Sequence, residues 1–426
     1  MLTDIFRDVR LADALSAADV TRLRQALTAR AKSIQQRMKG ALAQGDLRKF
    51  KHLCSDGFRS SGMRLWAHFK ALPDRPAAPL PLRLRVQQCA SLDPFSAHPR
   101  PLRWQLPKSE PNQYRDVFEF EPLDQARFYL VKLALDAIAR AHPTLHCTPS
   151  QTLSFGGRST ACNILFQALQ TAPREACFVQ IDVRSFYPSI ASEYLEKVLP
   201  LPREVIHRCI LTAPYLSKGP DRESEPTVVL WDGVYRGAGT IRSSTRMTDV
   251  LEAGVPPGAP HTEGRGSRRR FVPTGSATAS IAGEIAMGGA LGRVDHPEGV
   301  LAALVYSDNI GVLCANRASA GATADAYTHE LERYEGGPFR VRCSIRPIGD
   351  GFPFLGYIFR SQDGRVIAQP RPEGRQAFEL RWSERILRTR RDDEIRKAIQ
   401  ALHSYVAAFP LWTEGSAYLE ERLTQL

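Results

Sequence analysis

The sequence predicts an α+β protein in which helices and antiparallel strands occupy separate stretches of the chain. Residues 177–182 form an apolar run that ends at a carboxylate, as expected for a buried strand. Residues 301–314 place two apolar strands on either side of a polar turn, which predicts a tight hairpin. Helical spacing of apolar residues dominates residues 1–75 and 373–426. Strands in the middle of the chain and helices at both ends therefore define the fold class.

The chain of 426 residues is long enough for two or three domains with sizeable cores. Its net charge is +12, and most of the positive charge is arginine. Such a basic balance suggests a polyanionic partner such as a nucleic acid. An arginine-rich codon usage explains the same composition, so charge alone leaves the partner open.

No apolar run reaches the length of about 18 residues that a membrane helix requires. The N-terminus lacks a basic-then-apolar signal pattern. The eight cysteines are scattered and form no C-x-x-C pair. We therefore expect a cytoplasmic protein without a membrane partner, with reduced structural cysteines and no zinc site.

Residues 1–75 predict helices at the N-terminus. Ser16 is the expected cap of a long helix, because Asp19 follows three residues later and apolar residues continue from Leu23 at helical spacing. The many lysines and arginines of this region either hold RNA or form a solvated surface. Residues 72–106 contain many prolines and little periodicity, and we expect them to form a linker.

Two further helices are predicted ahead of the apolar strand at residues 177–182. Residues 123–141 form a strongly amphipathic pattern, and residues 161–169 form another behind a glycine pair. Arg158 and Ser159 at the start of the second helix suit a phosphate group. An ordinary serine cap of the helix explains the same residues.

The apolar strand delivers Asp182 to its carboxyl end. The aromatic pair Phe186 and Tyr187 follows, and a helix is predicted over residues 190–198. A buried carboxylate without a partner is costly, and a metal ion is the commonest reason for one. An aspartate that caps the following turn is an equal alternative.

The hairpin at residues 301–314 carries Ser307, Asp308 and Asn309 at its tip. If this hairpin lies beside the first strand in one sheet, Asp182 and Asp308 come together. Two carboxylates in one site repel each other unless a cation lies between them. Because Mg²⁺ takes oxygen ligands and uses one or two carboxylates plus substrate phosphates, the pair predicts a magnesium site.

These two stretches resemble motifs A and C of the reverse transcriptases. Motif A of that family is Asp-x-x-x-aromatic-aromatic, as in residues 182–187 here. Motif C is usually Tyr-Ala-Asp-Asp, whereas residues 306–309 read Tyr-Ser-Asp-Asn, with asparagine in place of the second aspartate. The surroundings of Asp182 are most similar to the bacterial retron, abortive-infection and defence-associated groups.

Other stretches resemble further motifs of the family in the correct order. They are residues 107–117 for the fingers hairpin, 154–160 for the Gly-Phe-Arg-x-Gly-Arg-Ser stretch, 271–280 for motif B and 352–358 for motif E, the primer grip. Thr274 stands where motif B usually has glutamine. A plain exposed hairpin explains the charges of the first of these stretches as well.

The resemblance implies a right-hand polymerase: fingers, a palm with a ferredoxin-like antiparallel sheet and a helical thumb, here with an α-helical N-terminal extension. The implied domains are residues 1–106 for the helical extension and linker, 107–176 for the fingers, 177–350 for the palm with an insertion at about 215–270, and 351–426 for the primer grip and thumb.

The resemblance also implies roles for individual residues. The catalytic residues are Asp182, Asp308 and Asn309. The metal ligands are Asp182, Asp308 and the backbone carbonyl of Val183, which would bind Mg²⁺, or Mn²⁺ because Asn309 removes a charge. Nucleotide contacts are implied for Lys108, Arg115, Arg184, Ser185, Phe186, Tyr187, Thr274 and Gly275. Primer or template contacts are implied for Arg158, Ser159, Tyr306, Leu355, Gly356 and Tyr357.

The implied activity is RNA-directed DNA polymerisation from dNTPs by two-metal nucleotidyl transfer, in bacterial antiphage defence. The implied partners are a structured non-coding RNA template, nascent DNA, and a second copy of the chain or a companion defence protein. An untemplated or protein-primed DNA polymerase of the abortive-infection type is one alternative, and a catalytically weak RNA-binding scaffold is another. The sequence leaves open the template, the priming mode and the oligomeric state.

Overall fold

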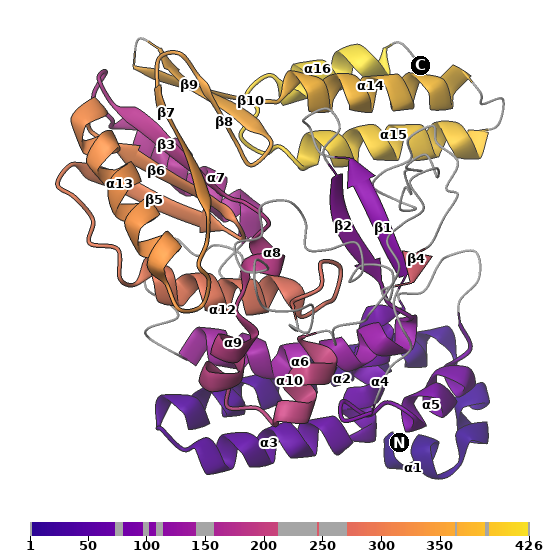
Figure 1. The fold of residues 1–426 in the computed structure, drawn as a ribbon. Helices are drawn as coiled ribbons and strands as arrows, with labels where there is room; N and C mark the ends of the chain where they lie inside the picture. Colours follow the sequence, from indigo (N-terminus) through magenta and orange to yellow (C-terminus); the bar gives the residue numbers. More distant parts are fainter. Residues whose placement is uncertain are drawn as a thin grey trace. The chain divides into compact units, whose positions relative to one another are not determined.

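The computed structural model describes residues 2–72, 80–96, 102–107, 114–141, 157–211, 245–246, 271–362, 364–387 and 392–424 (Figure 1). Contacts divide the chain into two units. The first comprises Met1–Cys147, Arg184–Gly292 and Glu332–Arg340, and the second comprises Thr148–Val183, Arg293–Leu331 and Val341–Leu426. The chain therefore passes several times between the units, and the expected four-part domain division stays a prediction.

The first unit begins with a helical region, as the sequence predicts. Its elements are α1 (Leu2–Arg7), the 3₁₀ turn η1 (Val9–Ala14), α2 (Ala17–Ala43), α3 (Leu47–Arg59), α4 (Ser61–Ala71) and α5 (Leu82–Ala90). Helix α2 begins behind the expected cap: the Ser16 side chain accepts from the Asp19 N–H at 3.2 Å, and the Asp19 carboxylate accepts from the Ser16 N–H at 3.2 Å. This reciprocal pair satisfies two backbone donors that the first turn leaves free.

Helix α5 corrects the expectation of a linker over residues 72–106. Leu82, Val86 and Cys89 are buried at helical spacing. Arg85 is only 1% exposed and donates from Nη1 to the carbonyl oxygen of Leu72 at 2.8 Å. A buried guanidinium is tolerated only when protein acceptors replace water, and the position of such an acceptor cannot be inferred from local sequence.

The remaining described residues of the first unit form a small sheet and five helices. The sheet has the order β2-β1-β4, with β1 (Leu102–Pro107), β2 (Tyr114–Glu119) and β4 (Thr245–Arg246). The helices are α6 (Pro122–Ala141), α8 (Phe186–Ser189), α9 (Ser192–Val198), α10 (Arg203–Cys209) and α12 (Ala279–Leu291). The expected insertion at about 215–270 lies outside the described residues except for β4.

The predicted helix over residues 190–198 is wrong at its start. The chain forms a single turn, α8, and then breaks before α9. Ile190 and Ala191 are extended, and the N–H of Ala191 donates to the carbonyl oxygen of Gly336 at 2.9 Å. This long-range hydrogen bond replaces an intrahelical one, so the break is set by tertiary structure.

The second unit contains the antiparallel sheet that the sequence predicts. Its order is β5-β6-β3-β7, with β3 (Cys177–Val183), β5 (Val300–Tyr306), β6 (Asn309–Cys314) and β7 (Val341–Pro347). Every neighbouring pair is antiparallel. Helix α7 (Gly157–Gln170) precedes β3, and α13 (Arg317–Arg333) connects β6 to β7. This strand order is that of a ferredoxin-like sheet, and β3 lies inside it.

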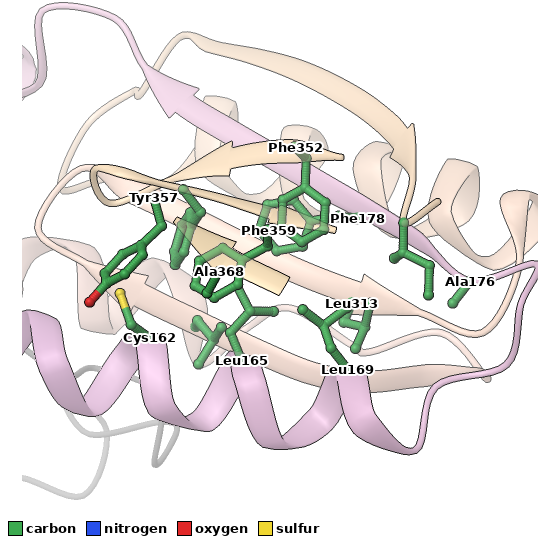
Figure 2. Close-up of a cluster of buried hydrophobic side chains, with 13 residues drawn as sticks. Cys162, Leu165, Leu169, Ala176, Phe178, Leu313, Phe352, Tyr357, Phe359 and Ala368 are labelled. Atoms are coloured by element: carbon green, nitrogen blue, oxygen red, sulfur yellow. The ribbon is translucent and has the colours of Figure 1, made fainter. Parts of the chain in front are cut away.

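A second antiparallel sheet of this unit packs against the first through aromatic side chains (Figure 2). It has the order β10-β9-β8, with β8 (Phe352–Phe354), β9 (Tyr357–Gln362) and β10 (Arg365–Pro370). The rings of Phe178 and Phe352 stack at 4.0 Å, and Phe354 meets Phe178 edge-on at 5.3 Å. Gly311 on β6 leaves the space for these rings, because a Cβ there would lie 2.4 Å from Phe178 Cζ.

Three helices follow at the C-terminus: α14 (Pro372–Leu387), α15 (Asp392–Ala407) and α16 (Gly415–Leu423). They enclose a core of their own, with Trp382, Leu402, Trp412 and Tyr418 buried. Trp382 Nε1 donates to the carbonyl oxygen of Ala398 at 3.0 Å and ties α14 to α15. The helical pattern over residues 373–426 is thus confirmed, and its role as a thumb stays a prediction.

The described cysteines match the expectation of structural thiols. All seven are free, and six of them are buried. Burial raises the pKa of the Cys54 thiol to about 12 and that of Cys162 to about 11, so these groups stay protonated and unreactive at neutral pH. Within the described part of the chain, no helix has the length and apolar character of a membrane span.

Gly311→Ala is expected to lower the free energy of unfolding by about 1–3 kcal/mol, because the new methyl group overpacks the Phe178 and Phe354 rings. Urea denaturation measures the change. Gly321→Ala in α13 is the control, since a Cβ there meets nothing within 4 Å and alanine is the better helix former. Equal stability of the two variants would contradict this account of the packing.

Candidate active site

The pairing of β3 with β6 places Asp182 and Asp308 next to each other. In the register of the two strands, Asp182 lies opposite Asn309. Asp308 is the second residue of the two-residue turn between β5 and β6, directly before Asn309. Because directly opposite residues have Cβ atoms about 4.5–5.5 Å apart, the two carboxylates share one end of the sheet. The predicted juxtaposition is therefore present, and their role as metal ligands stays a prediction.

The environment of Asp182 differs from the expected one. Its side chain is exposed, whereas Ile181 and Val183 on the opposite face of β3 are buried. The energetic cost of a buried carboxylate therefore does not explain why an aspartate ends this strand. Asp308 is half-buried, and its Oδ1 accepts a hydrogen bond from Asn309 Nδ2 at 3.1 Å.

Arg342 is a neighbour of the site that sequence reasoning missed. It lies on β7 directly opposite Asp182. Opposite residues of an antiparallel pair project to the same face of the sheet. Asp182 therefore lies between the amide of Asn309 on one neighbouring strand and the guanidinium of Arg342 on the other. The alternating pattern of β7 predicts an outward residue here, but only the register shows which residue it faces.

The donor set fits a hard divalent ion that also binds a substrate. Among the described residues, no group of three or more His, Cys, Asp or Glu side chains is arranged to hold a metal ion. Two neighbouring carboxylates are instead the partial set with which Mg²⁺ binds when waters and substrate phosphates complete its shell. Since Asn309 uses its amide nitrogen toward Asp308, its amide oxygen is the atom left to face a cation.

Left-handed backbone marks three of the predicted motifs. Among the described residues, the non-glycine residues with positive φ are Ser185 (49°), Ser307 (58°) and Leu355 (44°). Ser185 follows Asp182 by three residues, Ser307 precedes Asp308, and Leu355 lies in the β8–β9 turn. Such conformations cost about 1–3 kcal/mol each and cluster at functional sites. Ser307 and Leu355 lie in two-residue hairpin turns, whose geometry itself uses positive φ. Among the described residues, Ser185 is then the one whose positive φ a hairpin turn does not explain.

The aromatic pair of motif A lies on α8 in the first unit. Phe186 is 4% exposed and packs against Phe339, with ring centroids 5.7 Å apart. Phe186 is thus a core residue. Tyr187 is half-buried, and its ring lies 5.1 Å from that of Phe186.

One backbone donor in the segment with implied nucleotide contacts is already engaged. The N–H of Arg184 donates to the carbonyl oxygen of Arg340 at 2.9 Å, and the Arg184 side chain is exposed. The Arg340 carbonyl therefore occupies one N–H of the segment from Arg184 to Tyr187.

The glycine at position 275 of the motif B loop is explained by a close contact within the protein, not by the implied nucleotide contact. Its φ is +110°, and a Cβ there would lie 2.2 Å from the carbonyl oxygen of Phe118. The N–H of Phe118 donates to the carbonyl oxygen of Thr274 at 2.7 Å. Glycine is therefore required because the loop lies against β2, whether or not a nucleotide approaches it.

Gln125 on α6 is a second residue that sequence reasoning missed. Its Nε2 donates to the carbonyl oxygen of Gly275 at 2.9 Å, and its Oε1 accepts from the N–H of Ala277 at 3.2 Å. One side-chain amide thus holds both ends of the motif B loop. No sequence signal links it to a loop 150 residues away.

Four other residues have implied contacts with the nucleotide, the primer or the template. Lys108 lies outside the described residues. Arg115 lies on β2 opposite Leu106 of β1. Tyr306 ends β5 opposite Asn309, next to the carboxylate pair. Ser159 is exposed in the first turn of α7.

Arg158 has a protein partner where a template phosphate was expected. Its Nε donates to the carbonyl oxygen of Leu355 at 2.7 Å. Its guanidinium lies over the rings of Phe409 and Tyr357, at 4.7 and 5.4 Å from their centroids. The left-handed pair Leu355 and Gly356, with φ of 44° and 85°, is thereby held from outside the hairpin. Arg158 thus holds the β8–β9 turn, and the predicted phosphate contact stays a prediction.

Comparisons with known proteins give only distant similarities. No family model matches the sequence, and no curated protein matches it. Among solved structures, the chain is similar to telomerase from Candida albicans in complex with a fragment of telomeric RNA, at 10% identity and a TM-score of 0.35 over 76% of this chain and 56% of that one. It is also similar to the BmCPV RNA-dependent RNA polymerase at elongation state, at 13% identity and a TM-score of 0.39 over 77% of this chain and 29% of that one.

The chain thus spans about half of the telomerase chain and under a third of the viral polymerase chain. TM-scores below 0.5 do not establish a common fold. The function of this chain has to be judged from its own residues.

Arg158→Ala is expected to lower the free energy of unfolding by about 2–4 kcal/mol, because it removes a charge-assisted hydrogen bond and two cation–π contacts. Arg158→Lys keeps the charge but has no Nε–H for Leu355, so it should be destabilised as well. Urea denaturation measures the stability of both variants, and RNA-binding titrations run in parallel measure their affinity for RNA. Unchanged stability together with weaker RNA binding would instead indicate that Arg158 contacts a template phosphate.

Proposed function

We propose that the chain is a nucleic-acid polymerase whose reaction centre is built on Asp182 and Asp308. The observation that supports this most is the register of β3 and β6, which brings the two carboxylates to one end of an antiparallel sheet. The motif order and the left-handed Ser185, between Asp182 and Phe186, support the same site. A pair of carboxylates at that place suits phosphoryl chemistry with bound divalent ions.

Two Mg²⁺ ions, or Mn²⁺, bound there would activate a primer 3′-hydroxyl and stabilise the charge on the transferred phosphoryl group. Asp182 and Asp308 hold such ions through carboxylate oxygens, and the Val183 carbonyl adds a neutral one. Asn309 orients Asp308 by its hydrogen bond and lowers the negative charge of the site relative to a second aspartate. Backbone N–H groups from Ser185 to Tyr187 bind the triphosphate.

We further propose that the product is DNA and the template is RNA, with dNTPs as substrates. Tyr187 follows Asp182 by five positions, and its half-buried ring presents a flat surface that admits hydrogen at C2′ and excludes a hydroxyl. The net charge of +12 suits a nucleic-acid partner. A structured non-coding RNA and a role in antiphage defence are the finer form of this proposal, and they rest on the motif resemblance.

A second candidate function is that of an RNA-binding scaffold with weak or no catalysis. The observation that favours it is that both carboxylates already have protein neighbours, Arg342 opposite Asp182 and Asn309 bonded to Asp308. A cation at Arg342 reduces the repulsion that otherwise calls for a metal ion. Nucleotide incorporation separates the two candidates.

Asp182→Asn and Asp308→Asn are each expected to abolish dNTP incorporation, by about 10³-fold or more, because each removes a charged oxygen ligand from phosphoryl transfer. Primer extension on an RNA template with Mg²⁺ and with Mn²⁺ measures the effect, and thermal unfolding checks that the fold is kept. Asp325→Asn on α13 is the control for loss of one negative charge. Full activity in either variant would refute the site, and an inactive wild type that still binds RNA would favour the scaffold.

Tyr187→Ala is expected to raise rNTP incorporation relative to dNTP, because the ring no longer excludes a 2′-hydroxyl. Phe186→Ala should instead lower the free energy of unfolding by about 3–5 kcal/mol, since that ring is buried. Competition between matched rNTP and dNTP, with urea denaturation in parallel, measures both. A wild type that already prefers rNTPs would replace the DNA polymerase with an RNA-synthesising enzyme.

A further inference from the structure

Helix α12 carries more glycine than a helix normally does. Gly283, Gly288 and Gly289 lie within its 13 residues. Glycine is among the poorest helix formers, because it loses more backbone entropy than any other residue. The helix is also almost entirely buried. Glycine at such positions is explained by close approach of a neighbour, and Gly283 and Gly289 each have one.

The neighbour of Gly283 is the aromatic pair of motif A. A Cβ at this position would lie 2.7 Å from Phe186 Cε1, 3.1 Å from Phe186 Cζ and 3.3 Å from Tyr187 Cε1. The first distance is shorter than any carbon–carbon contact in a packed interior. Phe186 cannot simply swing aside, because it is buried against Phe339.

Gly289, on the same helix, has an unrelated neighbour. A Cβ there would lie 2.6 Å from Tyr194 Oη and still closer to Tyr334 Oη. These two tyrosines hydrogen-bond to each other through their hydroxyl groups at 2.5 Å. Gly289 therefore serves packing at a place that does not involve the motif A pair.

We propose that Gly283 is a position that determines the specificity for dNTP over rNTP. Because glycine has no side chain, Phe186 and Tyr187 can pack closely against α12. This inference rests on the proposed function, in which the half-buried Tyr187 ring meets C2′ of the incoming nucleotide. With α12 behind the pair, any group added at position 283 moves Tyr187 toward the sugar. Any volume removed from Phe186 lets Tyr187 retreat.

The proposal predicts shifts of opposite sign for two substitutions. Gly283→Ala narrows the space at C2′, so the ratio of kcat/KM for dNTP over rNTP rises by roughly tenfold, the effect of one methyl-sized group in a pocket. Phe186→Leu widens that space, so the ratio falls. The double variant combines the added methyl group with a smaller side chain, and its ratio returns toward the wild-type value because the two residues are in contact.

The experiment measures incorporation of matched dNTP and rNTP by the purified full chain and these three variants. Gly289→Ala is the control: it disturbs the same helix and lowers stability, but it leaves the sugar ratio unchanged. A merely structural role for Gly283 would lower the stability and total activity of Gly283→Ala with no change in ratio. If Gly283→Ala does not fold, Phe186→Leu alone still decides, because an unchanged ratio in that variant overturns the proposal.

The outcomes also separate this inference from the proposed function. A wild-type chain that incorporates no nucleotide refutes the polymerase itself. A wild type that polymerises, with equal sugar ratios in Gly283→Ala and Gly289→Ala, leaves the polymerase standing and refutes the role of Gly283.

Discussion

The antiparallel pairing of β3 between β6 and β7 is the constraint on which the second unit depends. Its register decides that Asp182 lies opposite Asn309 on one side and Arg342 on the other. A shift of one residue would turn every side chain of β3 to the other face, burying the carboxylate and exposing Ile181. The apolar residues of β3 therefore fix the position of the carboxylate by being buried themselves.

The same strand also carries the second sheet of its unit. Phe178 at the start of β3 stacks on Phe352 of β8, and Gly311 of β6 leaves room for both Phe178 and Phe354. One strand thus contributes a carboxylate at one end and an aromatic anchor at the other. Arg158 then fixes the turn between β8 and β9 through the Leu355 carbonyl. The carboxylate end of β3 and the β8–β9 turn belong to one packed unit.

Local sequence was sufficient wherever local interactions decide the structure. The Ser16–Asp19 cap, the hairpin around Asp308 and the antiparallel character of the sheet were all predicted, because capping and alternation act over a few residues. Features that depend on distant partners were missed or misread. Arg85 was placed in a linker because its acceptors lie in tertiary structure, and the Leu355 carbonyl that Arg158 contacts was missed because it is 197 residues away. Gln125 and Gly283 carry no local signal for the loops and rings they contact.

The central claim, that Asp182 and Asp308 together hold a divalent ion, is tested most directly by locating that ion on the chain. Fe²⁺ substitutes for Mg²⁺ at oxygen sites, and with ascorbate and peroxide it generates hydroxyl radicals that cut the backbone beside the bound ion. The account predicts two cuts in the purified full chain, one near residue 182 and one near residue 308, both suppressed by excess Mg²⁺. Cutting at only one of the two segments, or cutting that Mg²⁺ does not suppress, would contradict it.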